Sequence, residues 1–332
     1  MSGLGRVLDV QGYVVLDGGL ATALEAAGHV LDTALWSARL LADAPEAILE
    51  AHLGYLEAGA DCVTTASYQA TPQGFHAAGF SAAEADRLLE RSVRLAVEAR
   101  SVFLETVSGD RTGACGPGQP AQRPRPLVAA SVGPYGAFLA DGSEYSGRYD
   151  IGRSGLAAFH RARLHLLAAS GADILALETI PSLAEVEVLV ELLEEIEGVR
   201  AWISFTCRDG AHLRDGTPVE AAAEACSNRP GVEALCVNCT DPRHVGELLR
   251  RIGRVTRGPM GAYPNSGEAY DTASRRWVGE GAGAGWLEHV PAWVAAGARI
   301  VGGCCRVGPD AIRQLRATLE RSVLPGGRRR DS

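Results

Sequence analysis

The chain has 332 residues, of which 46% are hydrophobic and 22% are charged, and its formal net charge is −8. This much apolar material excludes a wholly disordered chain, and the acidic balance argues against a nucleic-acid-binding surface. No apolar run reaches the roughly 18 residues of a membrane-spanning helix, and residues 1–6 lack a signal-peptide pattern. We therefore expect a cytoplasmic protein with reduced thiols that binds neither membranes nor nucleic acids.

Eight short apolar runs rich in β-branched residues predict strands, with helical patterns between them. Several of these runs are almost continuously apolar, as parallel strands are when both of their faces are buried. In chain order the runs are Tyr13–Leu16, Asp61–Thr65, Leu127–Val132, Asp173–Leu177, Arg200–Phe205, Glu233–Val237, Met260–Tyr263 and Arg299–Val301.

The eightfold alternation of strand and helix favours an α/β fold of one domain, a (β/α)8 barrel of the TIM type. A doubly wound parallel sheet is the competing architecture, and periodicity alone does not decide between the two. We place the barrel domain at residues 1–320, because no linker divides the chain. The Gly-, Pro- and Arg-rich segment Ser108–Pro126 is expected to be a flexible surface insertion, and residues 321–332 a disordered tail.

Two of the predicted helices carry clear start signals. In Leu183–Glu197 the aliphatic side chains recur on one face, and Ser182 with Glu185 forms a capping box at its start. A second helix is expected at about Glu84–Phe103, with the same kind of signal beginning at Ser81.

Three of the eight cysteines follow predicted strands. Cys239 comes directly after the sixth run, and Cys304 and Cys305 come after the eighth. The C-terminal ends of barrel strands meet at one mouth, so these three thiols should converge there. Three thiolates suit a Zn²⁺ ion in a site that keeps one position open, whereas buried free thiols are the simpler alternative. Cys236 is left out, because residues three apart on a strand face opposite sides.

A zinc ion held by three thiolates is electron-rich, so it activates water poorly and suits the binding of a substrate thiol. A free thiol has a pKa of about 8.5 and is only a few per cent ionised at neutral pH. Coordination to a metal removes that limit, because a coordinating thiol is deprotonated. The predicted chemistry is therefore alkyl transfer to a thiol.

Carboxylates and aromatic side chains stand at other strand ends. Asp17 follows the first run and Glu178 the fourth, where they could recognise a substrate ammonium group. The alternative is that they cap loops or form salt bridges, which is common for an Asp-Gly-Gly turn. Tyr68 and Tyr135 could line a pocket for a cationic methyl donor, against the alternative that they only pack in the core.

With these motifs in view, the chain resembles the homocysteine S-methyltransferases, in particular the bacterial and plant branch that uses S-methylmethionine. The resemblance covers about Val14 to Ala317. Many matches in the same order make it far more specific than any single motif. The matching segments are Asp17–Gly19, Leu35–Ala38, Tyr55–Asp61, Ser67–Ala70, Ser131–Gly136, Asp141–Tyr145, Glu178–Thr179, Val237–Thr240, Tyr263–Gly267 and Gly302–Cys305.

The resemblance implies a (β/α)8 barrel with one zinc ion per chain held by Cys239, Cys304 and Cys305. It implies that Asp17 and Glu178 lie near the homocysteine amino group. It also implies that the loops containing Tyr68 and Tyr135 lie near the methyl donor. Asn265 completes the substrate-binding residues that we expect. Without substrate, Tyr68, Asn238 and Asn265 are the candidates for the fourth zinc position.

The function expected from this resemblance is zinc-dependent transfer of a methyl group to the thiol of L-homocysteine, which yields methionine. The donor would be S-methylmethionine or S-adenosylmethionine. The partners are therefore small molecules, and the oligomeric state stays open. Alternatives are a relative that uses betaine or selenohomocysteine, and a zinc- or thiol-based redox sensor with Cys304 and Cys305 as its switch. A lyase with a Schiff-base lysine is disfavoured, because no predicted strand end supplies a lysine.

Overall fold

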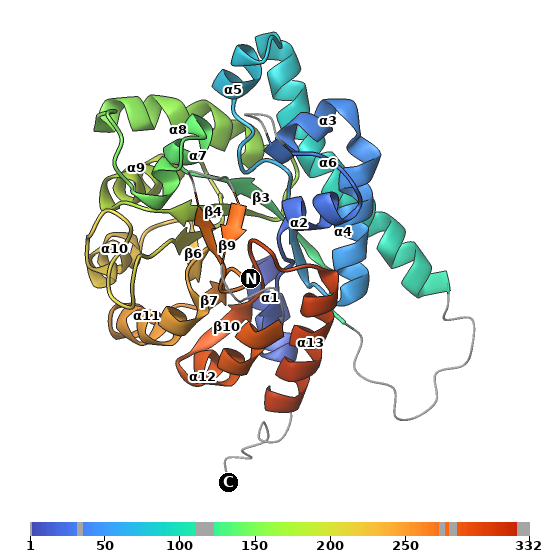
Figure 1. Ribbon diagram of the computed structural model, residues 1–332, viewed down its shortest axis with the longest axis vertical. Coiled ribbons are helices and arrows are strands. Elements are labelled where there is room, and N and C mark those ends of the chain that lie inside the picture. Colours follow the sequence, from blue (N-terminus) through green and yellow to red (C-terminus); the bar gives the residue numbers. More distant parts are fainter. Residues whose placement is uncertain (1, 32–35, 110–122, 272–275, 279–283, 324–332) are drawn as a thin grey trace.

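The computed structural model describes residues 2–31, 36–109, 123–271, 276–278 and 284–323. Eight parallel strands stand inside a ring of helices (Figure 1). Each strand coincides with one of the eight predicted runs. The strands are β1 (Val14–Val15), β2 (Cys62–Thr64), β3 (Leu127–Val132), β4 (Ile174–Ile180), β5 (Ala201–Phe205), β6 (Val232–Asn238), β7 (Met260–Tyr263) and β10 (Ala298–Val301).

The sheet closes on itself. Its hydrogen-bonded order is β1-β10-β7-β6-β5-β4-β3-β2, and a parallel bridge between Leu16 and Cys62 joins the two end strands. The (β/α)8 barrel is therefore confirmed, and the doubly wound sheet is excluded. Every residue of β3, β4 and β5 is buried, which explains why these runs are apolar without alternation.

Helices cover the outside of the barrel and bury its outward-facing side chains. These helices are α2 (Leu20–Ala26), α4 (Pro45–Ala58), α6 (Ala82–Gly109), α8 (Arg153–Ala168), α9 (Leu183–Glu194), α10 (Val219–Cys226), α11 (Pro242–Val255), α12 (Val290–Ala295) and α13 (Pro309–Val323). Further short helical segments lie in the loops: α3 (Leu40–Asp43), α5 (Pro72–Ala77), α7 (Tyr135–Leu139), η1 (Trp36–Arg39), η2 (Ser143–Tyr145) and η3 (Ala284–His289). A hairpin that we did not predict, β8 (Ala269–Asp271) with β9 (Arg276–Val278), follows β7.

A further helix, α1 (Gly3–Gln11), precedes the first strand and closes the N-terminal end of the barrel. Its Leu4 and Val7 belong to the same buried cluster as the inward-facing Val14, Leu127 and Trp202. The side chains of α1 therefore fill the N-terminal end of the barrel interior. The C-terminal end of the strands, where active sites lie in this fold, is not covered by α1.

The two predicted helix starts differ in outcome. At the start of α6, Glu84 Oε2 accepts hydrogen bonds from Ser81 N (2.8 Å) and Ser81 Oγ (2.6 Å), as a capping box requires. At the start of α9, Ser182 Oγ accepts from Glu185 N at 3.4 Å. The reciprocal half is a wrong prediction, because Glu185 is fully buried and its carboxylate accepts from Tyr135 N (2.6 Å) instead. The helix also ends three residues earlier than expected, at Glu194.

The expected insertion and tail fall largely outside the described residues, at 110–122 and 324–332. The described ends of Ser108–Pro126 are ordered: α6 continues to Gly109, and Arg123 donates to Ala60 O at 2.5 Å. At the other end of the chain, α13 continues to Val323, beyond the expected boundary at residue 320.

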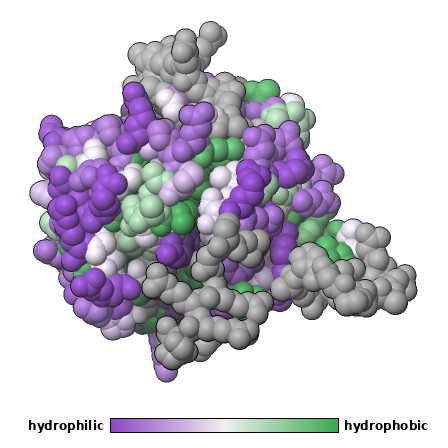
Figure 2. All heavy atoms as spheres, turned by 90° about the horizontal axis from the view of Figure 1, so that it is seen from below, coloured by the Kyte–Doolittle hydropathy of each residue, from purple (hydrophilic) through white to green (hydrophobic). Residues whose placement is uncertain are grey.

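None of the helices in the described segments combines the length and apolar character that crossing a bilayer would take. On the face in Figure 2, hydrophilic residues surround smaller hydrophobic areas. Among the described residues, the large apolar side chains that are exposed are scattered: Val10, Val30, Val102 and Val107.

Candidate active site

A cavity opens at the C-terminal ends of the strands, where function gathers in this fold. Its empty space, which includes the open mouth, is about 950 Å³. Its wall is formed by the loops after β1, β2, β3, β6 and β10 and by residues of β3, β4 and β7. The predicted residues that line it are Asp17, Tyr68, Glu178, Asn238, Cys239, Cys304 and Cys305.

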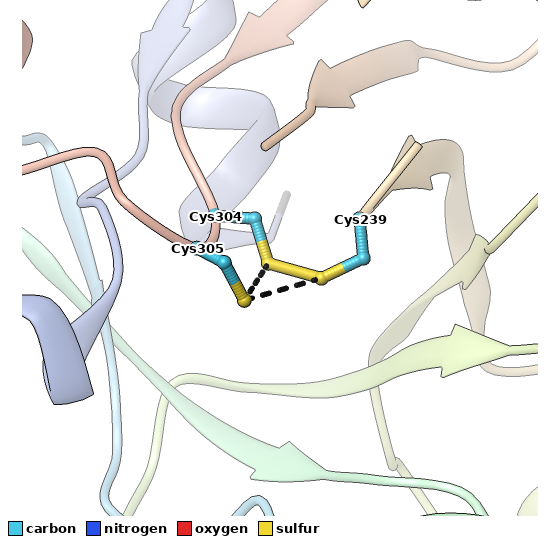
Figure 3. A group of neighbouring side chains, drawn as sticks. All are labelled: Cys239, Cys304 and Cys305. Carbon is cyan, nitrogen blue, oxygen red and sulfur yellow. Dashed lines mark hydrogen bonds between the residues drawn. A yellow bond between two sulfur atoms is a disulfide. The ribbon is translucent and has the colours of Figure 1, made fainter. Parts of the chain in front are cut away.

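The three cysteines meet in this cavity, as predicted (Figure 3). Cys239 and Cys304 are joined by a disulfide, and the Sγ atom of Cys305 lies 3.9 Å from that of Cys239 and 4.0 Å from that of Cys304. The sensor alternative assigned the switch to the adjacent pair Cys304 and Cys305. The structure instead bonds two cysteines that are 65 residues apart.

The donor set fits a zinc ion once the disulfide is reduced. All three sulfur atoms lie within 4.8 Å of one another. Tetrahedral zinc with Zn–S bonds of about 2.3 Å needs sulfur atoms about 3.8 Å apart, close to the two distances that Cys305 makes. Reduction adds two electrons and two protons to the disulfide and gives two thiols, which bind metal as thiolates.

The backbone presents Cys239 in an unusual conformation. Its φ of +44° lies in the left-handed region, which costs energy for a residue with a side chain. Its carbonyl accepts hydrogen bonds from Thr206 Oγ1 (3.2 Å) and Arg214 Nη2 (3.3 Å). These contacts hold the turn that aims the sulfur into the cavity.

Glycines bring the first and last loops of the barrel together. A Cβ atom on Gly18 would overlap the carbonyl oxygen of Val307, and one on Gly302 would overlap the Leu16 side chain. The two loops are also joined by a hydrogen bond from Gly303 N to Asp17 O at 2.9 Å. The position of Asp17 is thereby fixed relative to Cys304.

Asp17 lies at the end of β1 and is 3% exposed. Its Oδ2 accepts from Thr64 N at 2.7 Å, and Thr64 Oγ1 lies 3.1 Å from both carboxylate oxygens. Burial raises the pKa of Asp17 well above its usual value, the hydrogen bonds from Thr64 oppose this, and the nearby charge of Glu178 raises it further. A cation in the cavity would therefore stabilise its ionised form.

Glu178 lies in the last part of β4 and is 8% exposed. Ser131 Oγ donates a short hydrogen bond to its Oε1. Burial raises the pKa of Glu178 to about 7, and the hydrogen bonds from Ser131 and Tyr263 act in the opposite direction. Asp17 and Glu178 thus form a buried acidic pair in one cavity, which suits a ligand with an ammonium group.

Two candidates for the fourth zinc position behave differently. Asn238 is fully buried, and its Oδ1 accepts from Thr179 N (2.9 Å) and Ser204 Oγ (2.8 Å) while its amide donates to Thr179 Oγ1. Its side chain therefore links the ends of β4 and β5, and Asn238 also lines the cavity. Tyr68 lines the cavity too, and burial raises its pKa well above the usual value.

Tyr135 and Asn265 are not among the residues that line the cavity. The ring of Tyr135 packs edge-on against Phe159, with centroids 4.9 Å apart, in an aromatic cluster beside α7. Asn265 Oδ1 accepts from Gly267 N at 3.1 Å and so turns the loop after β7.

Several lining residues were not predicted. Thr64, Ser131 and Tyr263 sit at or near the ends of predicted strands, so a systematic reading of each last inward-facing position would have found them. Glu144 lies in the matching segment Asp141–Tyr145, although no role was predicted for it. Arg306 is different, because it comes from a loop whose course only the fold determines.

Comparison with known proteins now gives the family. The sequence model described as "Homocysteine S-methyltransferase" matches residues 14–319. The chain is 44% identical over 317 residues to homocysteine S-methyltransferase YbgG of Bacillus subtilis, covering 96% of this chain and 98% of that protein. It is 48% identical over 318 residues to homocysteine S-methyltransferase 4 of Zea mays (94% and 90%), and 46% identical over 318 residues to selenocysteine Se-methyltransferase of Brassica oleracea (93% and 89%).

The structure agrees with the sequence. The metallated form of the homocysteine methyltransferase MmuM from Escherichia coli superposes with a TM-score of 0.82 at 43% identity, covering 95% of this chain and 99% of that one. Its oxidized form gives a TM-score of 0.84 at the same identity, with 96% and 99% covered. On this fold, these thiols and this likeness over nearly its full length, the chain belongs to the homocysteine S-methyltransferase family.

Proposed function

We propose that this chain is a zinc-dependent homocysteine S-methyltransferase that takes its methyl group from S-methylmethionine. The observation that carries the proposal is the convergence of three cysteine sulfurs and two buried carboxylates in one cavity. The thiols suit a metal that binds sulfur, and the carboxylates suit the ammonium group of an amino acid. A thiol-containing amino acid satisfies both.

Cys239, Cys304 and Cys305 would hold the zinc ion, which would supply a Lewis acid that keeps the homocysteine sulfur ionised at neutral pH. Asp17 and Glu178 accept hydrogen bonds from the homocysteine ammonium group and so orient the substrate. The sulfur then attacks the donor methyl carbon. A new S–C bond forms while the donor S–C bond breaks, its electron pair stays on the donor sulfur, and the thiol proton leaves to solvent.

Both sulfur compounds that result from S-methylmethionine are methionine. The sulfonium charge disappears in the transition state, so a strong contact with it would stabilise the substrate more than the transition state. The chain should therefore hold the donor by its amino-acid end. An acidic cavity wall with Tyr68 and Tyr145 in it is compatible with a cationic donor.

A second acceptor class is a selenium analogue of the thiol. A selenol ionises more readily than a thiol, and selenium is a softer donor atom than sulfur. A metal held by the three thiolates would therefore bind a selenol as well, and the carboxylates would bind its ammonium group in the same way. The similarity to a selenocysteine Se-methyltransferase favours this extension.

We also propose a cytoplasmic location. The metal site needs Cys239 and Cys304 as thiolates, and the cytoplasm keeps thiols reduced. The disulfide between them must be reduced before both can bind a metal as thiolates.

The test is zinc content per chain measured beside methionine formation from homocysteine, with S-methylmethionine and S-adenosylmethionine as separate donors. About one zinc per chain and turnover with S-methylmethionine support the proposal. Turnover with S-adenosylmethionine but not with S-methylmethionine would show that S-adenosylmethionine is the donor and that the proposed donor is wrong. If the reduced, folded protein contained no zinc and formed no methionine, the three cysteines would be buried free thiols and the proposal would be wrong.

A further inference from the structure

A third carboxylate lines the cavity and has no role in the mechanism above. Glu144 belongs to η2, which follows α7, and it shares the cavity wall with Asp17, Glu178 and Cys305. Its Oε2 atom is buried and forms no hydrogen bond within the described residues. None of the ion pairs found among those residues includes it.

The loop that carries Glu144 is held in place. A Cβ atom on Gly136 would overlap the backbone of Glu144, so α7 and η2 touch without an intervening side chain. Asp141 accepts from Ser143 N at 2.9 Å, and Gly147 N donates to Ser143 O at 2.9 Å. The carboxylate is therefore presented by a fixed turn.

The charges around Glu144 indicate that its carboxylate lacks a cationic partner. Burial raises the pKa of Glu144 to about 7, a hydrogen bond from its own backbone N–H opposes this, and the charge of Asp141 raises it further. Its only indicated partner is thus its own backbone, and the Oε2 atom has none among the described residues. Its negative charge in turn raises the pKa of Cys305 and of Tyr68, so it acts inside the same cavity. A carboxylate removed from water without a partner destabilises a protein, and a cationic ligand would supply the missing partner.

We propose that Glu144 forms the subsite that binds the α-ammonium group of the methyl donor. The inference rests on the proposed function and adds the donor's recognition to it. Asp17 and Glu178 already hold hydrogen bonds from Thr64 and Ser131 and serve the homocysteine ammonium group, whereas Glu144 is left for a second cation.

The ammonium group is the better partner than the sulfonium. Its charge persists through methyl transfer, so Glu144 binds the ground state and the transition state equally and lowers KM without slowing the reaction. A carboxylate against the sulfonium would lose its partner in the transition state and reduce kcat. The site thereby selects sulfonium donors that carry an amino-acid end.

The experiment compares Glu144→Gln with the wild type on two donors. One is S-methylmethionine, and the other is dimethylsulfoniopropionate, a sulfonium that lacks the α-amino group. Loss of one charge-assisted hydrogen bond should raise the KM for S-methylmethionine about 10- to 100-fold. We expect kcat, the KM for homocysteine and the turnover of dimethylsulfoniopropionate to change less than about twofold. Glu98→Gln, which removes an exposed carboxylate on α6, is the matched control.

A second readout does not depend on turnover. S-methylmethionine should raise the unfolding temperature of the wild type and of Glu98→Gln, and raise that of Glu144→Gln much less. The inference is overturned by equal thermal shifts in all three proteins, by an unchanged KM for S-methylmethionine, or by a selective rise in the KM for homocysteine. A higher kcat in Glu144→Gln would assign the carboxylate to the sulfonium instead, which also overturns it. Failure of the wild type to form methionine would refute the proposed function alone, because the thermal shift still tests the subsite.

Discussion

Single residues decide whether the metal and the substrate can bind. The zinc site that we propose depends on thiols from β6 and β10, which β7 separates in the sheet. A hydroxyl is a far weaker ligand for zinc than a thiolate, because zinc prefers sulfur and nitrogen donors.

We expect Cys239→Ser, purified under reducing conditions, to retain almost no zinc and to form methionine more than about 100-fold more slowly. Zinc content by atomic absorption and methionine by chromatography measure the two effects. Cys226→Ala is the matched control, because Cys226 is a buried free thiol on α10. Activity of metal-free Cys239→Ser at the wild-type level would contradict the mechanism.

The pKa of Glu178, raised to about 7 by burial, predicts a pH dependence. Ionised Glu178 is needed to bind an ammonium group, so the Kd for homocysteine should rise up to tenfold per unit as the pH falls below about 7. Calorimetric titration of the zinc-loaded enzyme measures this. Glu178→Gln should bind more weakly and lose that part of the dependence, which separates it from titration of the homocysteine thiol.

The raised pKa of Glu178 also predicts how the stability of the folded protein changes with pH. The folded-state pKa of Glu178 lies above the ordinary value of 4.5, so the folded protein holds the proton more tightly than the unfolded chain. Its contribution to stability is present below about pH 4.5 and is lost as the pH rises through 7. If Glu178→Gln gained no stability relative to the wild type above pH 7, the buried carboxylate would not carry this cost.

Sequence reasoning reached these residues because strand ends converge in a parallel barrel. Cys239, Cys304, Asp17 and Glu178 could be placed at the mouth from the strand pattern alone. Glu185 shows where such reasoning fails: its spacing from a serine suggested a cap, yet tertiary contacts drew its carboxylate inward to Tyr135. No local pattern encodes that choice.

Among the elements, the loops after β1 and β10 form one unit. The loop after β1 packs against Val307 of the loop after β10, and their close approach requires glycine at positions 18 and 302. The barrel strands were predictable because each is a buried apolar run. The hairpin of β8 and β9 was not, because two three-residue strands give too short a pattern.

We expect Gly18→Ala to impair zinc binding and homocysteine binding together, because the new Cβ pushes the Asp17 loop away from the Cys304 loop. An increase in both dissociation constants of at least about tenfold is the expected result. Gly54→Ala on α4 is the control: nothing lies within 4 Å of its new Cβ, and the change should stabilise the helix by about 0.5–1 kcal/mol. A normal zinc content in Gly18→Ala would show that the loops do not move as a unit.

For the whole molecule, stability and function lie at opposite ends of the barrel. At the closed end, Asp61 precedes β2 and accepts from Val15 N (2.9 Å) and Gln11 Nε2 (2.6 Å). It also pairs with Arg316 and Arg123, and so connects the first and last helices of the barrel. From the sequence, Asp61 was expected to be the first residue of a strand. The fold shows instead that it precedes β2 and that its carboxylate accepts from the backbone of the neighbouring strand β1.

We expect Asp61→Asn to lower the free energy of unfolding by about 2–3 kcal/mol, less than for fully buried pairs because Arg123 is partly exposed. Zinc content and both KM values should stay unchanged, because the site is at the other end. Urea unfolding measures the stability. Asp310→Asn, which breaks an exposed pair with Arg313, should change it by less than about 0.5 kcal/mol. A change in KM without a loss of stability would contradict this separation.

The closure of the barrel has a consequence for its motions. β1 has two residues and meets β2 through the bridge of Leu16 with Cys62, and the carboxylate of Asp17 prolongs this contact by binding Thr64 N. Local opening concentrates where few hydrogen bonds must break. Asp17, which we propose to bind the substrate ammonium group, therefore also helps to close the barrel wall. If it does both, hydrogen exchange at the Thr64 amide should slow when the site is occupied.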